Sequence, residues 1–359
     1  MQKLRAATTV PAANAGATAR RDRLLLLQVG RGLAAIGVAL SHARLGTSAF
    51  VEPIPGWLMT ILEKGFLGVD FFFVLSGFII LNSHLDDESS LRTLKSYIFK
   101  RISRIYIPYW PVCAIVIAGY LLFPSLSNAN RDWGWWTSLF LVPSLHPPAL
   151  VAAWTLVHEM LFYTIFVLFF VGKRLFLTAS VAWVVAIMAN PSTAGFLAPL
   201  FSTLLNSINL EFFFGMICAL LYRRMGNFGA AVPWAALAVG VAIACGYFFT
   251  ATGEGPDRLL FGLGAAFLVL GAVLLERRVR GRVPDSLVRL GDASYAIYLL
   301  HNPLISLTSR AAARVPVLDR WAGSLIFSMI CVIGSGLLFH LFFERPVLGY
   351  LRKVIKSRT

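Results

Sequence analysis

Apolar stretches long enough to cross a bilayer recur along almost the whole chain, and they constrain its fold more than any other feature. A spanning helix needs about 20 mostly apolar residues, and its backbone amides must find hydrogen-bond partners inside the protein. With 58% hydrophobic residues and a mean hydropathy of +0.73, the 359-residue chain is predicted to be an all-α polytopic membrane protein of about ten transmembrane helices. The predicted spans are 24–43, 66–83, 106–123, 150–171, 175–190, 204–221, 230–250, 259–275, 293–309 and 322–343.

Lysine and arginine are distributed unevenly between the segments that join these spans. If the N-terminus is cytoplasmic, 24 of the 32 Lys and Arg residues fall in cytoplasmic segments, seven in outer loops and one, Arg31, in the first span. This positive-inside pattern predicts that both termini are cytoplasmic. Anionic membrane lipids are then the default partners of the net charge of +15, which needs no nucleic acid, and binding of an anionic cytosolic cofactor is a second use that stays open. We expect a disordered basic tail over 1–23, one transmembrane domain over 24–345 and a basic tail over 346–359.

The first span contains two ionisable residues, Arg31 and His42, which are eleven positions apart. At 100° per residue this spacing ends about 20° past three full turns, so both side chains lie on one helix face. They are separated by roughly 16 Å along the axis. Ionisable groups at membrane depth cost about 2.5–3.5 kcal/mol each on insertion scales, and they usually mark a functional site.

Polar residues at membrane depth occur in four later spans, as Asp70, Glu159, Glu211 and His301. On the predicted topology, the three carboxylates lie in the outer half or near the middle of the bilayer. Thr155, Glu159 and Tyr163 are spaced i, i+4 and i+8, so they share one face of their helix. Several acid and base groups are therefore predicted to meet at one depth.

These residue types suit two kinds of chemistry. A histidine can take a proton from a hydroxyl, a carboxylate can orient that histidine, and an arginine can hold a phosphate. The set fits acyl transfer to an alcohol, and it fits a proton relay in a transporter equally well. Structural roles are the alternative for three residues. Glu211 would be a buried hydrogen-bonding group, His301 would bond the backbone groups freed by Pro303, and Ser76 would pack between helices. No Walker motif, dinucleotide fingerprint, His-Glu-x-x-His or cysteine pair supports a metal or a tightly bound cofactor.

Six motifs in order resemble the acyltransferase-3 family of bacterial membrane O-acyltransferases. Each motif is weak alone, but their order and predicted topology agree from the first span to the ninth. They are Arg31-Gly-Leu-Ala-Ala with Ser41-His42, Gly68-Val-Asp-Phe-Phe-Phe-Val-Leu-Ser-Gly-Phe78, Arg101-Ile-Ser-Arg-Ile-Tyr-Ile-Pro108, Trp154-Thr-Leu with Glu159 and Phe162-Tyr163, Glu211-Phe-Phe-Phe-Gly215, and Ser294-Tyr-Ala-Ile-Tyr-Leu-Leu-His301.

The resemblance implies a ten-helix enzyme of the bacterial inner membrane. Such an enzyme takes an acyl group from cytosolic acyl-CoA and delivers it to a hydroxyl, and this chain is most similar to members that O-acetylate exopolysaccharide or lipopolysaccharide. His42 matches the family's expected catalytic residue. Some members carry an extracytoplasmic esterase-like domain, so a separate accessory transferase is a further expected partner.

The expected site follows from this resemblance. Acetyl-CoA would be a co-substrate, with its phosphates on Arg101 and Arg104 at the cytoplasmic side and Arg31 deeper on the route. His42 would act as general base or transient acyl carrier, oriented by Glu159 or Asp70. Thr155, Tyr163, Glu211 and His301 are the expected supporting residues. The alternative is a proton-coupled transporter or flippase of a glycan or lipid.

Overall fold

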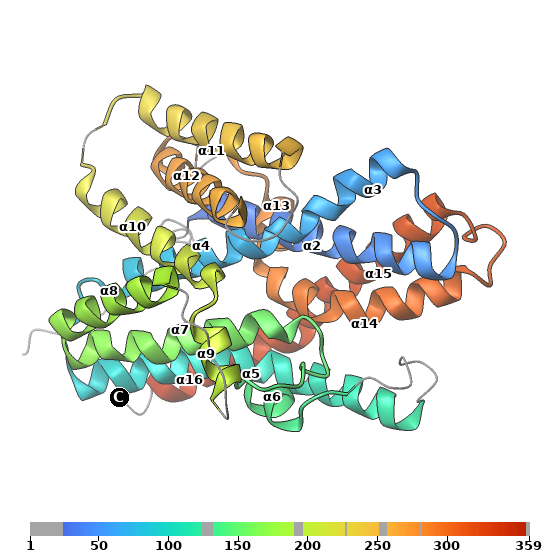
Figure 1. The fold of residues 1–359 in the computed structure, drawn as a ribbon, viewed down its shortest axis with the longest axis horizontal. Coiled ribbons are helices and arrows are strands. Elements are labelled where there is room, and N and C mark those ends of the chain that lie inside the picture. The colour runs from blue at the N-terminus through green and yellow to red at the C-terminus, as the bar shows by residue number, and fades with distance from the viewer. Residues whose placement is uncertain are drawn as a thin grey trace, which may run out of the picture.

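The computed structural model describes residues 24–123, 132–189, 197–226, 228–250, 257–279 and 282–356, and the elements in these ranges are all helices (Figure 1). The predicted tail over 1–23 lies outside the described residues. The helices are α2 (Leu25–Phe50), α3 (Gly56–Glu63), η1 (Lys64–Leu67), α4 (Gly68–His84), α5 (Leu91–Leu122), α6 (Trp135–Phe140), α7 (Ala153–Val171), α8 (Lys173–Ala189), α9 (Ala198–Leu204), η3 (Ser207–Asn209), α10 (Leu210–Arg224), α11 (Ala231–Thr250), α12 (Asp257–Val279), α13 (Asp285–Asp292), α14 (Ser294–Ala312), α15 (Trp321–Phe339), η5 (His340–Glu344) and α16 (Arg345–Lys356).

Each of the ten predicted spans overlaps a helix of the structure. By length and composition, six helical stretches among the described residues are able to cross a membrane: Leu25–Phe50, Gly56–His84, Leu91–Leu122, Ala153–Val171, Arg258–Glu276 and Trp321–Val354. A seventh is added if α9 and the η3–α10 stretch, which are bent by 43° relative to each other, form one span. The all-helical membrane fold is therefore confirmed, while the count of ten and the side of the termini stay predictions.

The N-terminus of α2 is held by a carboxylate from the far end of α12. The two side-chain oxygens of Glu276 accept hydrogen bonds from the backbone amides of Leu25 and Leu26, each at 2.8 Å. The first amides of a helix have no partner within it, and a negative charge there is favoured by the helix dipole. Glu276 is buried, so this contact fixes where α2 begins relative to α12.

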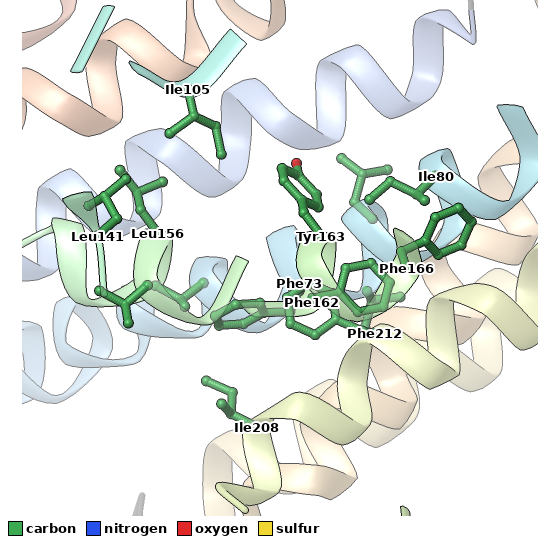
Figure 2. Packing of buried hydrophobic residues seen from close by; sticks show 14 of the residues in the cluster. Phe73, Ile80, Ile105, Leu141, Leu156, Phe162, Tyr163, Phe166, Ile208 and Phe212 are labelled. Carbon is green, nitrogen blue, oxygen red and sulfur yellow. The ribbon is translucent and has the colours of Figure 1, made fainter. Parts of the chain in front are cut away.

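Helices α4 and α10 cross at two glycines. A Cβ on Gly77 would collide with the Phe212 carbonyl, and a Cβ on Gly215 would collide with the Val74 carbonyl. Small residues allow this close approach, and van der Waals packing is the main attraction between helices in lipid. The crossing carries a buried aromatic cluster in which the Phe162 and Phe212 rings stack 4.2 Å apart (Figure 2).

Helix α2 lies beside α14 and α15, so the first described helix packs against helices from the C-terminal quarter of the chain (Figure 1). Gly46 packs against Ile305 and Ser309 of α14, and His42 lies against His301, so α2 and α14 run in the same direction. The segment predicted as a C-terminal tail is helical as far as Lys356, as α16, and packs beside α5. These two contacts place residues of α2, α14 and α16 around the candidate site.

Candidate active site

A small cavity of about 80 Å³ lies between α2, α4, α5, α7 and α14. This volume accommodates several water molecules, each needing about 10–15 Å³ of such space. Four of the predicted site residues line it: Arg31, Arg104, Thr155 and Glu159. The other lining residues are Val69, Phe72, Phe73, Leu75, Ser76, Ile79, Ile105, Leu156, Ser294, Tyr295 and Tyr298.

The predicted polar face of α7 is confirmed. Tyr163 donates its hydroxyl hydrogen to Glu159 Oε1, one turn away on the same helix. Ser76, on α4, also donates to Glu159 Oε1, at 3.2 Å. Thr155 forms a 2.9 Å hydroxyl–hydroxyl hydrogen bond with Tyr298 of α14. The Glu159 carboxylate is thus held by two hydroxyl donors at the wall of the cavity, where it remains able to accept further hydrogen bonds.

In the described part of the chain, no carboxylate makes direct contact with the two arginines of the cavity. Arg31 Nη1 donates to the Gln28 side-chain oxygen at 3.2 Å. Over the described ranges, neither Arg31 nor Arg104 has a carboxylate oxygen within 4.0 Å. Unpaired guanidinium groups at a cavity are suited to hold an anionic or carbonyl group of a ligand.

A second, larger hollow of about 1260 Å³ lies between the N-terminal half of α5 and α16; we call it the basic groove. Arg104 lines both the basic groove and the cavity, so the two spaces adjoin at this residue. The predicted cofactor residue Arg101 also lines the groove, where its guanidinium lies 5.8 Å from the Tyr97 ring and 5.5 Å from the Tyr163 ring. Its cationic residues are Arg92, Lys95, Lys100, Arg101, Arg104, Arg352 and Lys353, and the rest of its wall is Leu91, Ser96, Phe99, Ser103, Leu348 and Leu351.

His42 lies against a second histidine rather than a carboxylate. The ring centroids of His42 and His301 are 4.7 Å apart in an edge-to-face arrangement. His42 Nδ1 is 2.9 Å from the Val38 carbonyl oxygen, and His301 Nδ1 is 2.5 Å from the Tyr298 carbonyl oxygen. Because a carbonyl only accepts, we assign the ring hydrogen to Nδ1 in both residues, which leaves a lone pair on each Nε2. His301 is buried, and among the described residues its Nε2 has no hydrogen-bond partner.

The expectation that Asp70 or Glu159 orients His42 is not met by the geometry. Asp70 is fully buried and makes a bidentate ion pair with Arg258, at 2.6 and 3.0 Å. Glu211 lies beside this pair, also fully buried, which brings the two predicted carboxylates of α4 and α10 together. A bidentate arginine occupies the Asp70 oxygens, so in this structure the Asp70 carboxylate joins α4 to α12. Within the described structure neither Asp70 nor Glu159 hydrogen-bonds to His42, whose orienting group is the Val38 carbonyl.

Three residues of this region were not predicted as site residues. Ser76 was interpreted as helix packing beside Gly77; the glycine does pack, but the serine hydroxyl reaches Glu159. Arg258 directly precedes the predicted span 259–275. An arginine at this boundary was a detectable signal for a buried carboxylate partner. Tyr298 lines the cavity and its ring centroid lies 5.4 Å from that of His301, so it links the cavity to the histidine pair.

A family model described as an acyltransferase domain, that of the acyltransferase-3 family, matches residues 25–340. The exopolysaccharide production protein ExoZ of Rhizobium meliloti (strain 1021) is 32% identical over 308 residues, which are 81% of this chain and 92% of that protein. The acyltransferase MdmB of Streptomyces mycarofaciens is 27% identical over 365 residues, 89% of this chain and 90% of that protein.

A third relative is longer than this chain. The peptidoglycan O-acetyltransferase OatA of Listeria monocytogenes is 26% identical over 340 residues, 79% of this chain but 51% of that protein. No solved structure matches. The family match spans most of the chain and includes the cavity, the histidine pair and the predicted motifs. The chain therefore belongs to the acyltransferase-3 family and is a multi-pass membrane acyltransferase.

Proposed function

We propose that this protein transfers an acetyl group from cytosolic acetyl-CoA to a hydroxyl of a cell-envelope glycan, in the inner membrane of a bacterium. Exopolysaccharide and lipopolysaccharide, or their lipid-linked precursors, are the proposed acceptors. Two relatives bear names that refer to exopolysaccharide production and to peptidoglycan O-acetylation, and both materials are hydroxyl-rich envelope polymers. Family membership favours the acyltransferase over the transporter that the residue types alone left open.

The observation that supports the donor assignment is that the basic groove and the cavity meet at one residue, Arg104. Coenzyme A carries its phosphates at one end and its thioester at the other, joined by a narrow, mostly uncharged pantetheine arm. Arg101 and Arg104 stand where the phosphates would bind, and Arg104 also faces the cavity that the arm would enter. Arg31 and Glu159 line that cavity, and they supply a donor and an acceptor of hydrogen bonds for the amide groups of the arm.

The proposed chemistry is general-base catalysis by His42. The lone pair on Nε2 accepts the proton of the acceptor hydroxyl while its oxygen attacks the thioester carbonyl. A C–O bond forms, the C–S bond breaks, and the proton passes from His42 to the departing thiolate, which leaves as coenzyme A. The Val38 carbonyl keeps the His42 ring hydrogen on Nδ1. In a catalytic triad a carboxylate has this role. Transfer through an acyl-His42 intermediate, or to an accessory extracytoplasmic transferase, uses the same residue.

The first test is coenzyme A release from acetyl-CoA by the purified protein in nanodiscs, with an envelope-glycan extract as acceptor. We expect release by the wild type and its loss in His42→Ala, since general-base catalysis contributes about 10²–10⁴-fold. His146→Ala is the matched control, because His146 is exposed and pairs only with Asp132 in an outer segment. Equal release by wild type and His42→Ala would contradict the role of His42. The absence of release by the wild type would contradict the acetyl-CoA reaction.

A further inference from the structure

The C-terminal helix α16 forms one wall of the basic groove. Arg352 and Lys353, from α16, face the same hollow as cations of α5 that are about 250 positions earlier in the chain. None of the seven groove cations forms an ion pair with a carboxylate within the described ranges. Like charges held together on two elements repel one another, and a bound anion removes this repulsion. The groove is therefore built for a ligand with more than one negative charge.

We propose that the basic groove binds the adenosine 3′,5′-bisphosphate end of coenzyme A, with Arg352 and Lys353 contacting the 3′-phosphate. This inference rests on the proposed function. The diphosphate is attached directly to the pantetheine arm, so it lies nearest the cavity, at Arg104 and Arg101. The 3′-phosphate is on the ribose, farther from the arm. We assign it to the two cations that α16 supplies to the groove, Arg352 and Lys353.

The apolar part of the wall supports a nucleotide over an isolated phosphate. Phe99 of α5 and Leu348 and Leu351 of α16 line the groove together with the cations. An adenine ring has apolar faces that pack on such side chains, whereas the guanidinium and ammonium groups bind its phosphates. Arg101 lies over two tyrosine rings, which fix its guanidinium at the wall of the groove.

A kinetic comparison of two donors tests the assignment of the 3′-phosphate. We would measure KM and kcat of wild type and Arg352→Gln/Lys353→Gln with acetyl-CoA and with acetyl-3′-dephospho-CoA. Loss of a charged hydrogen bond corresponds to about tenfold or more in affinity. We expect KM for acetyl-CoA to rise about tenfold in the variant with kcat unchanged, and the wild type to show a similar rise with the dephospho donor. The variant should no longer discriminate between the two donors.

Two matched variants keep this test interpretable. Arg345→Gln removes an exposed cation from the same helix outside the groove, and we expect it to behave as wild type. Arg352→Lys/Lys353→Arg retains both charges and should retain the preference for the 3′-phosphate. If the glutamine variant still prefers acetyl-CoA by the wild-type factor, α16 does not contact the 3′-phosphate and the proposal is wrong.

A binding measurement decides the proposal even if no acetyl transfer is observed. Adenosine 3′,5′-bisphosphate should bind the wild type in phosphatidylcholine nanodiscs at least about tenfold more tightly than adenosine 5′-monophosphate, and this preference should disappear in Arg352→Gln/Lys353→Gln. If neither nucleotide binds, the proposal fails. The same measurement in nanodiscs that contain phosphatidylglycerol tests a lipid as the occupant. If this lipid abolishes the nucleotide binding that depends on Arg352 and Lys353, the groove is a lipid headgroup site. If acetyl-CoA is turned over but Arg352→Gln/Lys353→Gln does not change the preference between nucleotides, the proposal for α16 is wrong and the proposed function is unaffected.

Discussion

At the scale of single residues, the histidine pair is the arrangement that most affects the chemistry. His301 is buried, donates from Nδ1 to the Tyr298 carbonyl, and lies edge-to-face against the His42 ring, and its Nε2 has no hydrogen-bond partner in the part of the chain that the structure describes. In His301→Asn the new side-chain amide can still donate to the Tyr298 carbonyl, but no nitrogen lone pair remains. We expect kcat to fall about 10- to 100-fold, because a group that shares the His42 proton is lost. KM for acetyl-CoA should not change, since the donor phosphates bind elsewhere. His146→Asn is the control, and an unchanged kcat in His301→Asn would assign this residue to packing.

At the scale of elements, the α4–α10 crossing shows how motif glycines position the site. Gly77 and Gly215 allow the backbones to touch, and α4 also carries Ser76, which donates to Glu159. In Gly215→Ala the added methyl meets the Val74 carbonyl, which cannot move without its helix. Such overpacking costs about 1–3 kcal/mol, so we expect a lower melting temperature in detergent together with reduced activity. Gly334→Ala in α15 is the matched control, because its Cβ would enter open space and alanine favours helix over glycine. A wild-type melting temperature in Gly215→Ala would mean that the two helices do not depend on this contact.

The helices themselves were predictable, and their partners were not. Apolar runs in lipid have to become helices because the backbone has no other source of hydrogen bonds, so each predicted span overlaps a helix. The face shared by Thr155, Glu159 and Tyr163 also follows from spacing within one helix. By contrast, the pairing of Asp70 with Arg258 joins residues 188 positions apart. Which helix faces meet depends on packing, and one helix's periodicity carries no information about its neighbour. For the same reason, the histidine partner of His42 was not foreseen.

At the scale of the whole molecule, the proposed reaction requires the basic groove to face the cytoplasm, where acyl-CoA is available. The charge distribution predicts that α16 and the N-terminal half of α5 are cytoplasmic and that the segment before α7 is external. Leu145 in that segment and Lys353 in α16 are both exposed. In a cysteine-free background, we expect an impermeant maleimide to label Leu145→Cys in intact cells, or in spheroplasts where an outer membrane intervenes. Lys353→Cys should be labelled only after lysis. Labelling of Lys353→Cys in intact cells would place the groove outside, separate it from cytosolic acyl-CoA, and so contradict both the topology and the donor route built on it.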